Sequence, residues 1–416
     1  MNGLWIAPIR RCGNVQPAPS LALDFINTPA IPSGFTFSRA STATYFTAGG
    51  LLVSVGTDVP RFDHDFASGA ALGLQLESSR ANVLGLSTGM YIATRCTLTQ
   101  HEGIGADGSL TTTLITEDAT PASTHYASEA FPVSANMPMT FSGYFRADSR
   151  TQGCLFVDSA GWSSSNQALA IFDLSSATVV ELWNCTGGVQ KINNCLLRGW
   201  LTATSSTTVS GARALAMPAK NGQNSYDGAG GTVETWGWQV ESNTNEPSSY
   251  MPTAGAAFTR AADYLWTSQL VWLNATEGTA VIDGVVSAVK GGGTFLFSLD
   301  DGINNGIGIY KVNGSGNLTA YSGGANSTGL GVTLADGQRA RAAIAWSNAG
   351  ASASAAANGC TAVPVTSAGA VNASEFCIGS ARGRQFSGML WVRSFTYWPY
   401  RMADRDLAAL TAVPAT

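Results

Sequence analysis

Charged residues are scarce in this sequence of 416 residues, where they make up 12%, about half of the roughly 25% that is typical of globular proteins. The 22 Lys and Arg residues are outnumbered by 27 Asp and Glu residues. The basic residues form no dense stripe, which argues against nucleic acid as a partner. The hydrophobic fraction of 45% is ordinary for a folded protein and excludes a disordered, solvated chain.

Long apolar segments are also lacking. No run of about 18 uncharged apolar residues occurs, so we expect no membrane span. Near the N-terminus, Arg10 and Arg11 follow the apolar residues Leu4, Trp5 and Ile6, which is the wrong order for a secretory signal.

Cysteine and histidine are few as well. The seven cysteines form no Cys-x-x-Cys pair, and the three histidines lie far from paired cysteines, so we expect no metal site and no cofactor. The cysteines that could form disulfides are Cys185 with Cys195 and Cys360 with Cys377. The favoured alternative is that all are small thiols in a reducing cytoplasm.

The chain is instead rich in turn-forming residues, with 47 glycines and 15 prolines between short apolar runs. This pattern predicts an all-β protein of two or three domains. We expect an extended docking arm at 1–20 and a β-rich adaptor at 21–84. In the adaptor, Gly49 and Gly50 separate Tyr45–Phe46 from Leu51–Val53, which predicts a hairpin.

Two antiparallel β-sandwiches are expected after the adaptor, a jelly roll at 85–253 and a second sandwich at 254–416. At the C-terminal end, Asp404 is placed to cap a short helix that carries Leu407 and Leu410 and ends before Pro414. We interpret Ala349–Ala357 as a loop. The expected strands are Leu110–Thr116, Met139–Arg146, Cys154–Asp158, Leu169–Asp173, Thr178–Trp183, Val233–Val240, Thr279–Val286, Gly293–Leu299, Gly306–Val312, Arg341–Trp346 and Met389–Tyr397.

Two short segments are echoed within the sequence. Gly73–Ser78 parallels Gly237–Ser242, and Phe37–Ala40 parallels Phe258–Ala261. Similarities of this length also arise by chance in β-rich sequences of low diversity. No sustained period accompanies them, which excludes a solenoid or propeller.

Several of these motifs carry a resemblance to a known class of proteins. The stretch Phe37–Tyr45, followed by Gly50–Leu52, Asp58–Asp63, Gly73–Glu77 and Arg80–Asn82, resembles a segment that recurs in virion proteins of tailed bacteriophages. This resemblance implies a virion component, either a tail fibre or a head spike or decoration protein. The short N-terminal arm has no long repetitive shaft, which argues against a long fibre.

The two later regions have resemblances of their own. Trp236–Glu241, Pro247–Thr253 and Thr259–Asp263 are similar to the closing motif of a carbohydrate-binding jelly roll that follows this segment in such proteins. Ile378–Ser380, Phe386–Gly388, Trp391–Arg393, Tyr397–Pro399 and Leu407–Leu410 resemble a concanavalin-A-like or laminin-G-like lectin sandwich. Glycan binding is the activity that these likenesses imply.

Exposed aromatic rings are the side chains with which such a sandwich would hold a sugar. Trp236 with Trp238, and Trp391 with Phe395 and Tyr397, alternate along single strands and are expected in the core. Trp162, Trp183, Tyr226 and Tyr250 lie in or beside turns. The alternative for these four is that each closes one end of the core. The glycan-binding candidates are Trp162, Trp183, Tyr226, Tyr250, Trp398 and Tyr400.

No set of residues makes a convincing catalytic site. A polysaccharide-degrading enzyme would need two carboxyl groups about 5 to 10 Å apart, for which Glu181, Glu234 and Glu241 are the available acids. Asp300-Asp301-Gly302 suits a hairpin turn better than a calcium loop, and the acids Asp63 and Asp65 flank His64. We expect no catalytic residues.

The leading hypothesis is therefore a non-enzymatic virion protein that is assembled in the host bacterial cytoplasm. It would dock through its N-terminus on portal, tail or capsid proteins and display its sandwiches to a host cell-surface glycan or to another virion protein. A homo-oligomer is expected, with a trimer first. The alternatives are a tailspike-type enzyme that degrades polysaccharide and an architectural decoration protein without a ligand.

Overall fold

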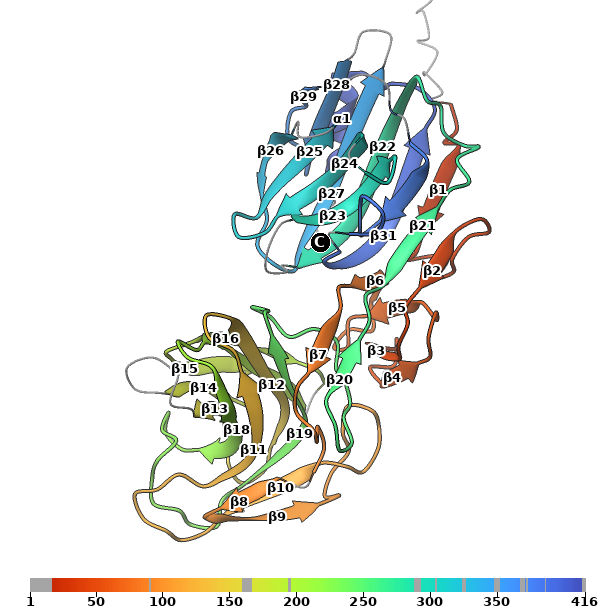
Figure 1. Cartoon of the computed structure of the whole chain (residues 1–416). Helices are drawn as coiled ribbons and strands as arrows, with labels where there is room; N and C mark the ends of the chain where they lie inside the picture. Colours follow the sequence, from red (N-terminus) through yellow and green to blue (C-terminus); the bar gives the residue numbers. More distant parts are fainter. Residues whose placement is uncertain are drawn as a thin grey trace, which may run out of the picture.

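The chain folds almost entirely into antiparallel β-sheets, arranged as two sandwiches that are joined by the adaptor (Figure 1). The predicted all-β class is confirmed. The computed structural model describes residues 17–89, 91–158, 167–193, 196–287, 293–303, 305–323, 327–347, 352–366, 371, 373–385 and 387–413.

The C-terminal sandwich is built from two large sheets that enclose an apolar core containing Leu76, Ile282, Phe297, Ile344 and Phe395. Strand β1 (Leu21–Asp24) extends the first sheet by pairing with β31. In spatial order the other strands of the first sheet are β29 (Val363–Thr366), β28 (Ser352–Ala357), β27 (Gln338–Ser347), β22 (Glu277–Ser287), β31 (Met389–Trp398), β6 (Ala71–Glu77) and β5 (Arg61–His64). The second sheet runs β2 (Thr36–Ser38), β21 (Tyr264–Thr267), β30 (Glu375–Ile378), β23 (Gly293–Asp300), β24 (Gly306–Val312), β25 (Asn317–Ser322) and β26 (Ser327–Thr333).

The other sandwich has the two-sheet architecture expected for 85–253, and its core includes Leu84, Phe141, Leu155 and Trp238. One sheet runs β16 (Thr186–Lys191), β17 (Leu197–Thr204), β12 (Pro138–Ala147), β19 (Thr232–Ser242), β10 (Thr113–Glu117) and β9 (Cys96–Gln100), with β7 (Arg80–Asn82) paired to β19 and β20 (Phe258–Arg260) paired to β7. The other sheet runs β15 (Thr178–Trp183), β14 (Gln167–Asp173), β13 (Gln152–Asp158), β18 (Val209–Ala219), β11 (Tyr126–Val133) and β8 (Ile92–Thr94).

Residues 21–84 contribute strands to both sandwiches. β1, β5 and β6 belong to the first C-terminal sheet, β2 belongs to the second, and β7 pairs with β19 of the other sandwich. The expected hairpin forms between β3 (Ala43–Phe46) and β4 (Leu52–Val55). In Figure 1, β5 and β6 lie at the junction of the upper and lower sandwiches, with β1 beside the upper one and β7 beside the lower one. The chain preceding β1 reaches β31, since the Ser20 amide donates to the Tyr397 carbonyl at 3.0 Å; residues 1–16 of the expected docking arm lie outside the described residues.

Two expectations for the C-terminal region need correction. Ser352–Ala357 is not a loop but strand β28, whose last five residues are buried. The small side chains suit this position because the helix α1 (Asp404–Thr411) packs on the strand, with Ala356 and Leu407 in one apolar cluster. The helix itself is confirmed, but Ala403 rather than Asp404 is its N-cap residue, and Asp404 instead pairs with Arg401.

The cysteines in the described part of the chain are free thiols: Cys96, Cys154, Cys185, Cys360 and Cys377. The pairing of Cys360 with Cys377 is therefore not formed. Cys12 and Cys195 lie outside the described residues, and so does the proposed bond between Cys185 and Cys195. Over the described ranges, no helix is both long and apolar enough to cross a membrane.

Candidate functional site: a pocket at the junction of the two sandwiches

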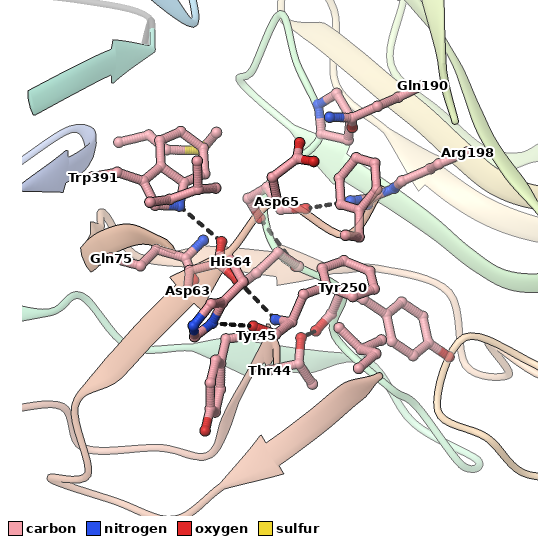
Figure 2. Close-up of a pocket in the computed structure, with 18 of the residues that line it drawn as sticks. Thr44, Tyr45, Asp63, His64, Asp65, Gln75, Gln190, Arg198, Tyr250 and Trp391 are labelled. Atoms are coloured by element: carbon pink, nitrogen blue, oxygen red, sulfur yellow. Dashed lines mark hydrogen bonds between the residues drawn. The ribbon is translucent and has the colours of Figure 1, made fainter. Parts of the chain in front are cut away.

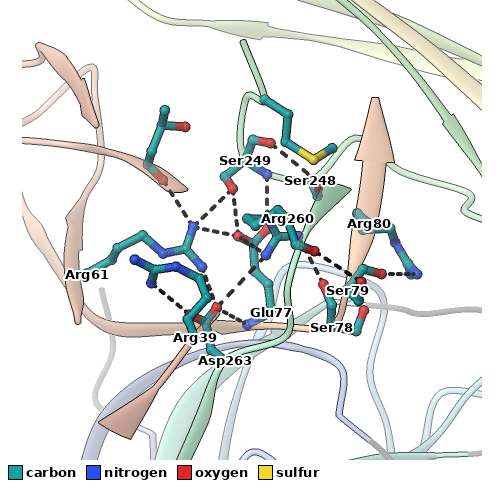
Figure 3. Close-up of polar contacts among 12 residues, drawn as sticks. Arg39, Arg61, Glu77, Ser78, Ser79, Arg80, Ser248, Ser249, Arg260 and Asp263 are labelled. Atoms are coloured by element: carbon teal, nitrogen blue, oxygen red, sulfur yellow. Dashed lines mark hydrogen bonds and ion pairs between the residues drawn. The ribbon is translucent and has the colours of Figure 1, made fainter. Parts of the chain in front are cut away.

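A buried ionic cluster joins the adaptor to the segment that links the sandwiches. Arg61 binds both Glu77, at 2.7 Å, and Asp263. Arg39 reaches Asp263 at 3.0 Å, and Arg260 reaches Glu77 at 3.0 Å (Figure 3). All five side chains are at most 1% exposed. Because removal of one member would leave a buried charge unpaired, the cluster fixes the relative position of its strands.

The pKa of Glu77 reports the balance of forces in this cluster. Burial alone would raise it, but Arg260, Arg61 and hydrogen bonds from Ser249 outweigh burial and lower the pKa to about 2. Glu77 is therefore a carboxylate at neutral pH, as the surrounding guanidinium groups require.

One loop binds a glutamate from each sandwich. The Ser248 hydroxyl donates to Glu241 on β19 at 2.6 Å. The next residue, Ser249, donates its amide to Glu77 on β6 at 3.0 Å and its hydroxyl at 2.7 Å. Since β19 and β6 belong to different sandwiches, the two serines connect them through consecutive residues.

A pocket of about 260 Å³ opens beside this cluster (Figure 2). It is lined by the adaptor, by the jelly-roll region and by the C-terminal sandwich. Its aromatic side chains are Tyr45, Phe46, Phe66, Tyr250 and Trp391. Its polar lining includes Asp63, His64, Asp65, Gln75, Gln190 and Arg198.

Asp63 holds the wall of the pocket together. Its Oδ1 accepts the amide of Phe46 at 2.8 Å, and its Oδ2 accepts the indole N–H of Trp391 at 2.8 Å. Burial raises the pKa of Asp63. The neighbouring His64 makes a contact of 3.2 Å between its Nδ1 and the Phe46 carbonyl. Both oxygens of Asp63 are thus occupied by groups of the protein.

Trp391 faces the pocket because of a β-bulge. The pairing of β31 with β22 shifts register at Arg393, and this reverses which side chains point inward. Val392 before the bulge and Phe395 after it both enter the core, although they differ in parity. The expectation that Trp391 belongs to the core with Phe395 is therefore wrong: Trp391 is half-buried and lines the pocket.

Arg198 on β17 forms part of the opposite wall. Its Nη1 donates to the Ser248 carbonyl at 2.8 Å, its Nη2 donates to the Ser142 hydroxyl at 3.0 Å, and its guanidinium carbon lies 5.3 Å from the centre of the Tyr144 ring. The side chain is 7% exposed. Its charge is therefore directed mainly into protein contacts.

Two polar groups of the pocket retain free bonding capacity. Asp65 uses Oδ1 to accept the amide of Ser68 at 2.8 Å and its hydroxyl at 2.6 Å, and within the described residues its Oδ2 has no hydrogen-bond partner. Figure 2 shows its carboxylate between Trp391 and Arg198. Gln75 is 3% exposed, and its Oε1 is buried without a partner in the described part of the chain.

Of the five predicted glycan-binding residues that the structure describes, Tyr250 alone lines this pocket. It is 3% exposed, and its hydroxyl donates to Ser87 at 2.7 Å. Tyr226 is 8% exposed and donates to Glu117 at 2.7 Å. Both tyrosines are thus packed in the protein, because a protein acceptor satisfies each buried hydroxyl.

The other candidates are dispersed. Trp183 ends the edge strand β15 and is 37% exposed. Trp398 and Tyr400 are half-buried against the cluster under α1. Trp162 lies outside the described residues. Trp236 and Trp238, expected in the core, are 2% and 0% exposed, which confirms that expectation.

The acids of the enzyme alternative do not converge. Glu241 is buried and accepts hydrogen bonds from Ser248 and Gln239, whereas Glu234 pairs with Arg146. Both lie on β19 seven residues apart, which is roughly 20 Å along an extended strand. Glu181 lies on the exposed edge strand β15 of the other sheet. The span along β19 exceeds the about 5 to 10 Å that a glycosidase needs.

No clustering of metal-ligating side chains is found among the described residues. In the segment considered for calcium, Asp300 is buried and accepts the backbone amides of Gly302 and Arg382. Asp301 accepts the amide of Ile303 at 2.9 Å. These carboxylates therefore stabilise the turn by accepting backbone amides.

Neither a protein-family model nor a curated protein sequence matches the chain. Among solved structures, the CBM40 module of the Ruminococcus gnavus IT-sialidase, bound to α2,3-sialyllactose, is 13% identical over 33% of this chain and 84% of that one, with a TM-score of 0.29. Mouse laminin α1 domains LG4-5 are 11% identical over 77% and 97%, with a TM-score of 0.26. A tail fibre protein of an E. coli phage is 9% identical over 78% and 40%, with a TM-score of 0.19.

Proposed function

We propose that this chain is a non-enzymatic structural component of a tailed-phage virion and that it binds a host-surface glycan in the junction pocket. Its N-terminal arm would dock on other virion proteins, and its two sandwiches would be displayed as one body. The observation that carries the binding role is the pocket itself, in which aromatic side chains lie beside polar groups with free bonding capacity.

The phage-like motif supports the structural part of this proposal. Arg39, Arg61 and Glu77 lie within the segments that resemble tailed-phage virion proteins, and all three belong to the buried ionic cluster. Their role in the fold is to hold together strands of different sheets. A protein that must present a binding surface at a distance from its anchor benefits from such a fixed connection.

Binding is favoured over turnover by the way in which the pocket carboxylates are used. Asp63 has a raised pKa, which by itself would suit a general acid. However, the Phe46 amide and the Trp391 indole each donate to one of its oxygens, so both oxygens are engaged with the protein and neither is turned toward a substrate. Asp65 is then the one carboxylate of this pair with a free oxygen.

Competition for adsorption tests the proposal. Purified full-length chain should reduce the adsorption of the cognate particles to host cells, and periodate oxidation of the cell-surface sugars should abolish binding of the chain. Immunogold labelling with an antibody to the chain should mark intact particles. Unlabelled particles would refute the virion role, and labelled particles with no binding of the chain to cells would favour the purely architectural alternative.

A reducing-end assay separates binding from catalysis. Incubation of the chain with host capsule or lipopolysaccharide should release no new reducing ends. Turnover that is lost in Asp63→Asn, Asp65→Asn or Glu234→Gln would establish the polysaccharide-degrading alternative instead.

A further inference from the structure

We propose that the junction pocket binds a single uncharged hexopyranose ring, that Asp65 and Gln75 recognise its hydroxyl groups, and that the pocket discriminates against sugars that carry a carboxylate. This inference rests on the proposed glycan-binding function and specifies the class of sugar and the residues that select it.

The size of the pocket limits the ligand. Its volume of about 260 Å³ lies just below the roughly 300–1,000 Å³ of pockets that enclose drug-sized ligands. One sugar ring is of suitable size, whereas several enclosed rings are not. A longer glycan would therefore place one residue in the pocket and leave the rest outside.

The free polar groups match hydroxyls, which both donate and accept hydrogen bonds. Asp65 offers its Oδ2 atom, which has no partner among the described residues. An ionised carboxylate oxygen carries no proton, so it can only accept a hydrogen bond. The Oε1 atom of Gln75 is buried and has no hydrogen-bond partner within the described part of the chain, so it can accept from a ligand hydroxyl. A buried acceptor without a partner is costly in a protein, so a ligand hydroxyl that donates to Oε1 gains affinity.

The charges of the pocket oppose an acidic sugar. Asp63 and Asp65 place two carboxyl groups in the lining. The cation Arg198 donates one N–H of Nη1 to Ser248 and one of Nη2 to Ser142, lies against Tyr144 and is only 7% exposed, so its charge is turned mainly toward the protein. A ligand carboxylate would meet the repulsion of Asp65, while the guanidinium of Arg198 is held against protein groups.

The aromatic lining completes the match. Trp391 is fixed by its bond to Asp63 and is half-buried in the wall. The C–H face of a pyranose ring packs on such an indole, while its rim of hydroxyls reaches the polar groups. Because the protein already holds the Trp391 indole in place, this side chain loses little conformational entropy when a ligand binds.

Matched sugars provide the test. Isothermal calorimetry on the full-length chain compares methyl glycosides of glucose, galactose and mannose with glucuronate and galacturonate, which differ from two of them by a carboxylate at C6. We expect at least one neutral glycoside to bind about tenfold or more tightly than the uronates. Asp65→Asn should lower the affinity for the neutral sugar about tenfold. It should also reduce the difference in affinity between the neutral sugar and the matching uronate, because it removes the repulsion of the uronate carboxylate.

Control variants exclude a folding defect and a remote site. Gln75→Met preserves side-chain length and should also weaken the neutral sugar, while circular dichroism confirms that each variant is folded. Glu181→Gln, on the exposed strand β15, should bind like the unmodified chain.

The outcomes separate this inference from the proposed function. Equal or tighter binding of a uronate overturns the inference, and so does unchanged affinity in folded Asp65→Asn. If the chain competes with particles for adsorption but binds none of the neutral glycosides, the inference fails and the proposed function stands. If the chain neither binds a sugar nor competes, both fail.

Discussion

Glu77 on β6 and Glu241 on β19 are bound by consecutive serines of one loop, Ser249 and Ser248. The two glutamates are the equivalent residues of the echoed segments Gly73–Ser78 and Gly237–Ser242. Each lies near the end of its strand in a different sandwich. The echo thus coincides with a physical connection, in which similar strands present a carboxylate to the same loop.

Removal of the Glu77 charge tests the importance of this connection. Glu77→Gln leaves Arg61 and Arg260 without one of their carboxylate partners in a fully buried cluster. Loss of one partner of a buried ion pair costs about 3 to 5 kcal/mol, so the free energy of unfolding in a denaturant titration should fall by that amount. Glu181→Gln on the exposed strand β15 is the matched control and should change it by less than about 0.5 kcal/mol. Equal stabilities for the two variants would contradict this role.

The same residue makes stability depend on pH in a defined direction. The folded-state pKa of Glu77 is about 2, below its ordinary value of 4.5. A depressed pKa contributes stability that is present above pH 4.5 and is lost as the pH falls toward 2. The midpoint of thermal unfolding should therefore decline between about pH 5 and pH 2. Asp63, whose burial raises its pKa, acts in the opposite direction. The comparison with Glu77→Gln isolates the contribution of Glu77. The thermal midpoint of this variant should decline less steeply with falling pH than that of the unmodified chain. An equally steep decline in the variant would refute the assignment.

The bond between Asp63 and Trp391 should couple the adaptor strand β5 to β31 across the intervening strand β6 of the same sheet. Trp391→Phe removes the indole donor and leaves Asp63 Oδ2 without that partner. A hydrogen bond to a charged group contributes about 1.5 to 3 kcal/mol. A double-mutant cycle with Asp63→Asn, followed by circular dichroism in denaturant, should yield a coupling energy of about 1 kcal/mol or more. Additive effects of the two substitutions would show that the contact does not contribute.

Gly73 is required by the close approach of β6 to β31. Its φ is +107°, and an added Cβ would lie 2.1 Å from the carbonyl oxygen of Val392. Gly73→Ala should therefore destabilise the chain by more than the roughly 1 to 3 kcal/mol of backbone strain alone. Gly56→Ala is the control, because a Cβ at Gly56 meets nothing within 4 Å. Comparable thermal midpoints for the two variants would contradict the close packing.

Local patterns predicted many of the strands but not their partners, and they assigned the residues of strand β28 to a loop. Met389–Tyr397 was expected as a strand, and β31 spans Met389–Trp398. Its pairing with β6, in which Leu390 lies opposite Leu76, joins residues more than 300 positions apart. No local periodicity encodes such a pairing, and the distribution of residues 21–84 over both sandwiches therefore became visible only in the structure.

The candidate site was only partly predictable for a related reason. Alternation along a strand assigns side chains to faces, but the bulge at Arg393 reverses the assignment and turns Trp391 toward the pocket. Tyr226 and Tyr250 were expected beside polar turns, and burial with the acceptors Glu117 and Ser87 follows from contacts distant in sequence. Asp63, His64 and Asp65 stood out as an acidic pair around a histidine. Gln75 lies in the echoed segment Gly73–Ser78, but nothing there marked it as a binding residue, and Arg198 gave no signal, since an isolated arginine in a strand has no distinctive pattern.

A crystal structure of the full-length chain with a bound neutral hexoside tests the account most directly. We predict sugar density in the junction pocket, with a hydroxyl within hydrogen-bond distance of Asp65 Oδ2 and the ring against Trp391. Density at another place, such as the exposed edge near Trp183, with an empty junction pocket would contradict the account.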